Sequence, residues 1–189
     1  MASTVQICNL ALSKIGEESI TALSDNSQTA RHCALLYEPM RDAVLQAHAW
    51  NFATSRVELG RSTDTPAFGY AYNYALPADC VRVIQMEDPD TNYKVEGRNL
   101  LTDASEAKII YIKSVTDPNQ FTPLFIEALS ARLAMELAIP ITDSNTLTRS
   151  LVQLYEAKIQ EARQADATEG TPNEIIDSTW ISARYGFGG

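Results

Sequence analysis

The stretch Pro66–Gln85 reads PAFGYAYNYALPADCVRVIQ, and it marks the change from helical to extended structure in this chain. Every second residue from Phe68 to Tyr74 is aromatic. Because side chains alternate sides along an extended segment, this spacing predicts that the aromatic rings share one face. Two interpretations stay open, a cover for a small sheet or a subunit interface, since tyrosine offers a large rigid ring with a polar tip. The residues concerned are Phe68, Tyr70, Tyr72 and Tyr74.

A second extended run follows at Cys80–Ile84. Simple alternation would place Cys80, Arg82 and Ile84 on one face and the two valines between them on the other. Further short apolar runs are separated by turn-forming residues, and Gly97 favours a hairpin turn. We therefore predict a small antiparallel β-rich insertion over residues 54–117. The strands expected besides Cys80–Met86 lie at 57–59, 93–96, 99–101 and 108–112.

The residues before this insertion have helical periodicity. Apolar residues at helical spacing predict a helix over Thr4–Ile15, with Ser3 as its N-cap and Gly16 at its end. A second helical segment runs from Gln28 to about His48. Pro39 lies in its middle, which predicts either a kinked helix or two short helices. Trp50, in the run Trp-Asn-Phe that follows, is expected in the core.

After the insertion, Thr122-Pro123 has the sequence of a helix start, with threonine as N-cap and proline in the first turn. This third helix has almost no polar face, so it is either central or covered by a partner. We expect Pro140 to end it, and Asp143 or Ser144 to cap a fourth helix. The predicted fold class is α+β, mainly α. It is a bundle of about four helices (1–53 and 118–167) with the β-rich insertion and an extended C-terminal tail.

The C-terminal extension, residues 168–189, combines turn formers with large apolar side chains. A solvated tail rarely carries such anchors, which are typical of interfaces. We expect this segment to dock on a neighbouring chain or partner, the alternative being that it folds back on its own helices. The expected contact residues are Ile176, Trp180, Arg184, Tyr185 and Phe187.

The composition limits the possible functions. The chain has 189 residues, a net charge of −9 and 45% hydrophobic residues, which suits one well-cored domain. The charge is spread out and no segment is basic, which argues against a nucleic-acid clamp. No run predicts a membrane span or a secretory signal. The three cysteines have no metal-ligand spacing, so we expect small core residues in a reducing compartment.

The sequence offers little catalytic chemistry. It contains no P-loop, dinucleotide fingerprint, metalloprotease motif or nucleophile elbow. His32 and His48 are expected to be structural. Acidic clusters could serve a glycosidase, but all fall in polar turns where solvated charge is usual. We therefore expect no enzyme activity, no cofactor and no catalytic or metal-binding residues. The acidic clusters are Glu17-Glu18, Glu87-Asp88-Asp90 and Asp103 with Glu106.

Several longer runs together resemble one family. They are YEPMRDAVLQAHAWNFA (37–53), PAFGYAYNYALPADC (66–80), YKVEGR (93–98), LTD (101–103), and YI (111–112) with VTDP (115–118). The N-terminal run ICNLALSKIGE (7–17) fits as well. Together they resemble the head-to-tail adaptor proteins of tailed bacteriophages, also called tail tubular protein A. The resemblance covers most of residues 5–166.

The resemblance implies a structural virion protein. Members of the family have a helical bundle with a β-rich insertion and assemble as a ring, commonly of twelve subunits, beneath the portal. The ring extends the DNA channel and gives the tail nozzle or tail tube proteins a surface to bind. The implied partners are other copies of the chain, the portal, tail proteins and passing DNA, without a membrane. The alternative is a carbohydrate-binding or glycoside-hydrolysing tail protein, because aromatic ladders can stack on sugars.

Overall fold

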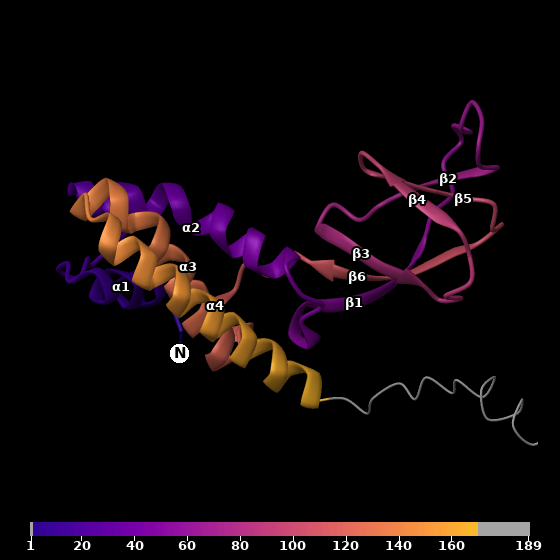
Figure 1. The fold of residues 1–189 in the computed structure, drawn as a ribbon. Coiled ribbons are helices and arrows are strands. Elements are labelled where there is room, and N and C mark those ends of the chain that lie inside the picture. The colour runs from indigo at the N-terminus through magenta and orange to yellow at the C-terminus, as the bar shows by residue number, and fades with distance from the viewer. Residues whose placement is uncertain (1, 170–189) are drawn as a thin grey trace, which may run out of the picture.

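The structure is a computed structural model that describes residues 2–169, and the predicted C-terminal extension lies almost entirely outside them. The described residues have an α+β fold with four α-helices and two small antiparallel sheets (Figure 1). The helices are α1 (Thr4–Ile15), α2 (Gln28–Gln46), α3 (Pro123–Thr142) and α4 (Asn145–Thr168), with 3-10 turns η1 (Asn51–Ala53) and η2 (Pro118–Gln120). The strands are β1 (Thr54–Leu59), β2 (Tyr72–Ala75), β3 (Cys80–Met86), β4 (Tyr93–Glu96), β5 (Asn99–Thr102) and β6 (Ala107–Lys113).

The helix starts are set by side-chain caps. The Ser3 and Ser27 hydroxyls accept hydrogen bonds from the backbone N–H of Gln6 and Ala30, which opens α1 and α2. The Thr122 hydroxyl opens α3 in the same way and Ser144 opens α4. The predicted bounds of α1 are therefore confirmed, and Ser144 rather than Asp143 caps α4.

Pro39 and Pro140 both lie inside helices of the structure. Pro39 lies inside α2, which is one continuous helix rather than two. Pro140 lies inside α3, so the prediction that it ends this helix is wrong. The helix continues for two more residues and ends at Asp143, whose φ of 49° is left-handed. Pro140 cannot donate a backbone hydrogen bond within the helix, but only two helical residues follow it, so little of α3 lies beyond the disruption.

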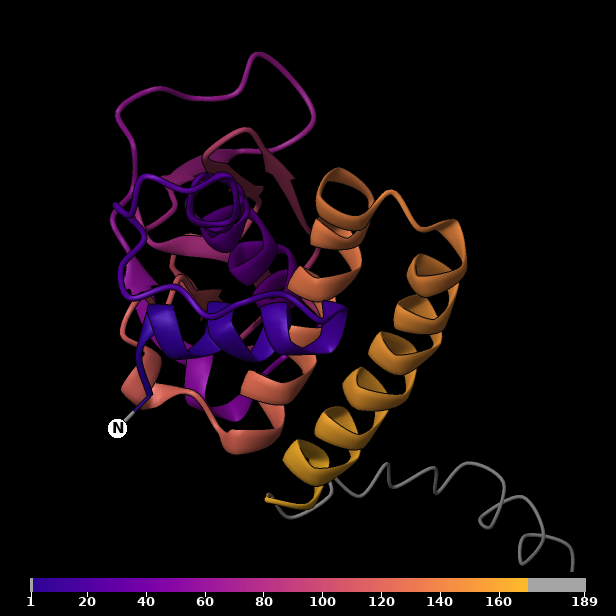
Figure 2. The ribbon, with the colours of Figure 1, turned by 90° about the vertical axis from the view of Figure 1, so that its left-hand side faces the viewer.

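Helix α3 is central, which is one of the two alternatives that its lack of a polar face left open. It packs against α1, α2 and α4, and Figure 2 shows α4 running alongside it while α1 crosses in front. Its buried residues join one large core with residues from the other helices. Trp50 has 0% of its surface exposed, packs edge-to-face on Phe125 at 5.1 Å, and donates its indole N–H to the Val44 carbonyl at 2.9 Å. The prediction of a core Trp50 is confirmed.

The two sheets have the orders β1-β6-β3 and β2-β5-β4. A second hydrophobic core contains side chains from both sheets, among them Leu59, Tyr74, Leu100 and Ile109. Tyr111 of β6 belongs to this second core, whereas the next residue, Ile112, belongs to the helical core. Strand β6 therefore joins the two cores through side chains on its opposite faces.

The predicted alternation along β3 is wrong. Cys80 and Val83 pack in the core of the β region, whereas Val81 and Ile84 pack against the helical core. The pairing of β3 with β6 shifts between Cys80 and Arg82 and again between Val83 and Gln85. Each bulge adds one residue and reverses the side-chain alternation that follows.

None of the helices in residues 2–169 has the length and apolar character that crossing a membrane would need.

Candidate functional site

The most exposed aromatic residue of the described chain lies on the loop that joins β1 to β2. Phe68 has 89% of its surface exposed. The loop projects from the end of the β region that lies away from the helices (Figure 1). Gly69 beside it has a φ of 90°, a backbone conformation that other residues rarely adopt. The Asp103 carboxylate accepts a hydrogen bond from the Ala71 N–H at 2.8 Å and fixes the end of the loop.

The four aromatics of the predicted ladder do not share one exposed face. Only Tyr72 and Tyr74 lie in a strand, and Phe68 and Tyr70 precede it in the loop. Tyr74 is 1% exposed and donates its hydroxyl to the Ala104 carbonyl at 2.9 Å. Tyr74 is thus part of the chain's own core, which corrects its assignment to an interface. Tyr72 is half-buried, with the Arg61 guanidinium 3.9 Å from its ring centre.

A groove of about 540 Å³ lies where this loop meets the sheet β2-β5-β4, and we call it the loop groove. Lys94 and Glu96 form an ion pair at its rim, 2.7 Å apart, and this contact raises the pKa of Lys94. The buried Asn73 carboxamide oxygen has no hydrogen-bond partner within the described residues. The lining of the groove combines aromatic, apolar and polar side chains. Its lining is Pro66–Tyr70, Asn73, Lys94, Glu96, Asn99 and Leu101.

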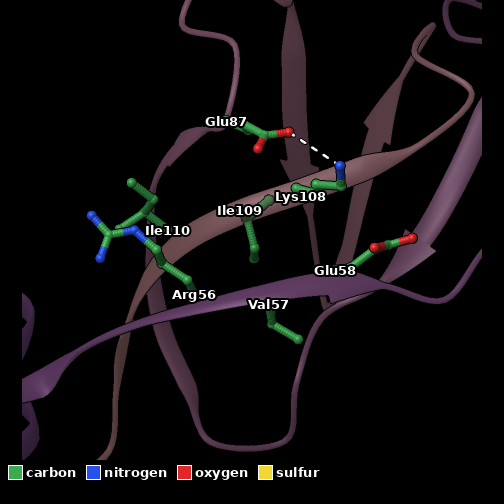
Figure 3. Close-up of a pocket in the computed structure, with 7 residues that line it drawn as sticks. All are labelled: Arg56, Val57, Glu58, Glu87, Lys108, Ile109 and Ile110. Atoms are coloured by element: carbon green, nitrogen blue, oxygen red, sulfur yellow. Dashed lines mark ion pairs between the residues drawn. The ribbon is translucent and has the colours of Figure 1, made fainter.

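A second groove, of about 410 Å³, lies on the sheet β1-β6-β3, and we call it the β1 groove (Figure 3). Lys108 reaches the Glu87 carboxylate at 3.4 Å, which raises the pKa of the lysine. Arg56 and Glu58 extend from β1 in different directions along the groove (Figure 3). The ion pair occupies Glu87, one of the two carboxylates that line the groove, and Glu58 is the other.

The predicted acidic clusters have structural contacts. Asp88 accepts hydrogen bonds from the N–H of Asp90 and the hydroxyl of Thr91, which closes the turn after β3. Asp103 holds the aromatic loop, and Glu106 approaches Lys108 to 3.9 Å. These contacts match the interpretation of turn-forming and solvated charge.

One pair that sequence reasoning missed has the residue types of a serine–lysine catalytic dyad. The Lys14 ammonium donates to the Ser130 hydroxyl at 3.0 Å, and burial lowers the pKa of Lys14. Ser130 is 0% exposed, however, and its hydroxyl already donates to the Glu127 carbonyl at 2.9 Å. A substrate could not reach this oxygen, so the pair joins α1 to α3 rather than catalysing a reaction.

His48 has structural contacts, and the three cysteines are free and buried. His48 lies 3.2 Å from the Asp166 carboxylate and stacks edge-on against Trp50. Cys8 and Cys33 are both buried in the helical core, where the neighbouring Cys33 thiol and burial raise the pKa of Cys8. Residues 2–169 contain no cluster of three or more side chains that could hold a metal ion.

The predicted contact residues of the extension lie outside the described residues, so the structure does not bear on them. They are Ile176, Trp180, Arg184, Tyr185 and Phe187. Among the predicted interface residues that are described, Phe68 and Tyr70 lie together at the loop groove. No protein-family model matches the chain, and no curated protein matches it.

Proposed function

We propose that this chain is a head-to-tail adaptor of a tailed bacteriophage. It would act as a structural virion protein in the neck, assembled in the host cytoplasm, and form a ring beneath the portal. The ring would extend the DNA channel and bind tail nozzle or tail tube proteins. The proposal is supported by the sequence runs that resemble this family and by the exposed aromatic loop.

The exposure of Phe68 is the observation that carries the proposal. Phe68 has 89% of its surface exposed to water, so its ring contributes almost no hydrophobic stabilisation to the fold of its own chain. Aromatic residues are common among the contacts that contribute most to protein interfaces. Tyr70 and the apolar part of the loop groove lie next to Phe68 and would extend the same contact. We assign this surface to a neighbouring subunit or a tail protein.

In the proposed ring, the four helices act as a bundle that forms the body of each subunit. Residues 54–117 are the β-rich insertion that carries the exposed loop, and residues 168–189 are the extension that docks on a partner. Proteins bind DNA phosphates through lysine and arginine side chains. A subunit with a net charge of −9 that is spread along the chain offers few such contacts, which suits the wall of a channel through which DNA passes. Rings of this kind need no catalytic group.

The test compares two substitutions of exposed apolar residues. Phe68→Ser removes the aromatic contact, and Leu35→Ser is the matched control, because Leu35 is 69% exposed on α2, outside the loop groove. Native mass spectrometry of each variant mixed with the portal of the same virus measures assembly. We expect Phe68→Ser to weaken ring or tail-protein binding while Leu35→Ser assembles normally. If both variants assemble equally well and bind tail proteins, Phe68 is not part of the interface.

The second candidate function is carbohydrate binding in the phage tail. The loop groove favours it, since its lining combines the Tyr70 ring with the polar side chains of Lys94 and Asn99. Incubation with host surface polysaccharide distinguishes the two candidates. Release of reducing sugar that is lost on substituting Glu87 or Asp88 would favour the hydrolase, and saturable binding without turnover would favour a lectin-like role.

A further inference from the structure

Strand β1 has an unpaired edge in the described part of the chain. It pairs with β6 on one side only, since the sheet order is β1-β6-β3. The corresponding edge of β2 is covered, because Arg61 bridges to Tyr74 and the Ser62 N–H donates to the Asn73 carbonyl at 2.8 Å. An open strand edge presents backbone N–H and C=O groups that readily pair with another strand. The edge of β1 is therefore available for a further strand.

The described chain ends near the segment that leads into β1. The Asp166 carboxylate accepts the Asn51 N–H at 3.0 Å, and the Asn51 side chain donates to the Asp166 carbonyl at 2.7 Å. Strand β1 begins only three residues after Asn51, at Thr54. Figure 1 shows the end of α4 on the side of the β region where β1 lies. The chain thus leaves α4 two residues after its contact with Asn51, which precedes β1 by three residues.

The remaining chain is long enough to follow the strand. Residues 170–189 number twenty, whereas β1 has six residues. At about 3.3 Å per extended residue, β1 spans roughly 20 Å, and nine residues of extended chain reach beyond it. A segment that leaves α4 beside Asn51 and runs in the direction of β1 would lie parallel to it.

The chemistry of the two segments is complementary. Arg56 of β1 has no ion-pair partner among the described residues, and it extends over the β1 groove next to Ile110 (Figure 3). The sequence NEIIDSTWIS (173–182) contains the acidic residues Glu174 and Asp177 together with three isoleucines, a threonine and a tryptophan, residue types that favour strands. Placing Asp177 beside Arg56 sets Ile176 and Trp180 on the face of Val57 and Leu59, which belong to the core of the β region.

We propose that residues 174–181 add to the free edge of β1 of their own chain as a parallel strand. This strand would cover the open edge in the unassembled protein and extend the core of the β region through Ile176 and Trp180. The proposal does not depend on the adaptor function. In a ring, the same segment could exchange this contact for one with a partner.

Disulfide trapping tests the proposal on the full chain. In the proposed register Thr179 lies beside Glu58, so Glu58→Cys with Thr179→Cys should form an intrachain disulfide in dilute protein. The matched control is Glu96→Cys with Thr179→Cys, because Glu96 lies on the edge strand β4. A docked segment has a high effective concentration at its own site, so we expect the first pair to oxidise about tenfold faster or more. Peptide mapping and non-reducing electrophoresis identify the products.

Each outcome decides the proposal. Fast intrachain oxidation at Glu58 with slow oxidation at Glu96 supports the added strand, and Arg56→Glu should then slow it. Equal rates at the two positions, or no disulfide at either, overturn it. A disulfide that forms only between two chains also overturns it, because the segment would then pair with a second copy. Hydrogen exchange gives an independent readout: removal of residues 170–189 should speed exchange of the β1 amides that do not bond to β6.

Discussion

Asp166 in the last turn of α4 accepts a hydrogen bond from the backbone N–H of Asn51, a residue 115 positions earlier in the chain. The same carboxylate lies 3.2 Å from His48. Both contacts join the end of α4 to the segment that enters β1. Asp166 is only 6% exposed, so these partners replace much of the water that an aspartate normally binds. The carboxylate therefore ties the helical part to the β region at the point where the described chain ends.

Removing this carboxylate should destabilise the fold. Asp166→Ala leaves the Asn51 N–H without its acceptor, and an unsatisfied buried donor costs about 1–3 kcal/mol. Asp166→Asn keeps one carbonyl oxygen and should cost less. Glu169→Ala, at the exposed end of α4, is the control. Urea unfolding measures all three, and an Asp166→Ala variant as stable as the control would show that the contact does not hold the two parts together.

Truncating Trp50 should be among the most damaging single changes. The indole is fully buried between the helical core and the start of the β region, so Trp50→Ala should lower the free energy of unfolding by about 3–5 kcal/mol. Trp50→Phe keeps most of the packing and loses mainly the bond to Val44, so it should cost much less. Thermal melting followed by circular dichroism checks both variants. A negligible loss in Trp50→Ala would contradict the packing described.

Substitutions at the two ends of the aromatic stretch should change the stability of the fold by different amounts. Tyr74→Phe removes a buried hydroxyl bonded to Ala104 and should cost about 0.5–1.5 kcal/mol. Phe68→Ser, in the exposed loop, should leave stability unchanged within about 0.5 kcal/mol. Denaturant titration of the unassembled protein compares the two. The reverse ranking would mean that Phe68 is packed in solution and cannot be the exposed contact.

The pH dependence of stability should reveal Lys14. Its pKa in the folded chain is lowered from 10.5, mainly by burial, so the unfolded chain binds the proton more tightly. Stability should therefore rise with pH between the lowered pKa and 10.5, and Lys14→Met should lack this rise. Lys158 should show the opposite trend: Glu127 and Glu161 raise its pKa, so the stability that its charge contributes is lost as the pH rises above 10.5. Urea unfolding from neutral to alkaline pH measures the slope, and parallel curves for parent and Lys14→Met would contradict the assignment.

The local elements of this fold are predictable from the sequence. Ser3, Gly16 and Thr122 mark helix ends by hydrogen bonds to nearby residues, so the pattern alone locates them. The strands at 93–96 and 99–102 flank Gly97, whose φ of 60° suits the predicted turn. These features depend on neighbours in sequence, and the structure confirms them.

The features that the sequence did not reveal depend on distant contacts. The bulges in β3 arise from its pairing with β6, and they redirect Cys80 and Ile84 to different cores. The Lys14–Ser130 contact joins residues 116 positions apart, which no local pattern encodes. The aromatic alternation was misleading because the chain becomes a strand only at Tyr72. A period of two cannot distinguish a strand from a loop that happens to alternate.

The central claim is the ring beneath the portal, and electron microscopy of the purified protein mixed with portal from the same virus tests it most directly. We predict that copies of this chain assemble as a ring on the tail-facing end of the portal, with its channel continuous with the portal channel. A protein that is monomeric by itself would still agree, since such a ring can form on the portal alone. A protein that remains monomeric and never binds portal, under all conditions of salt and concentration, would contradict the account.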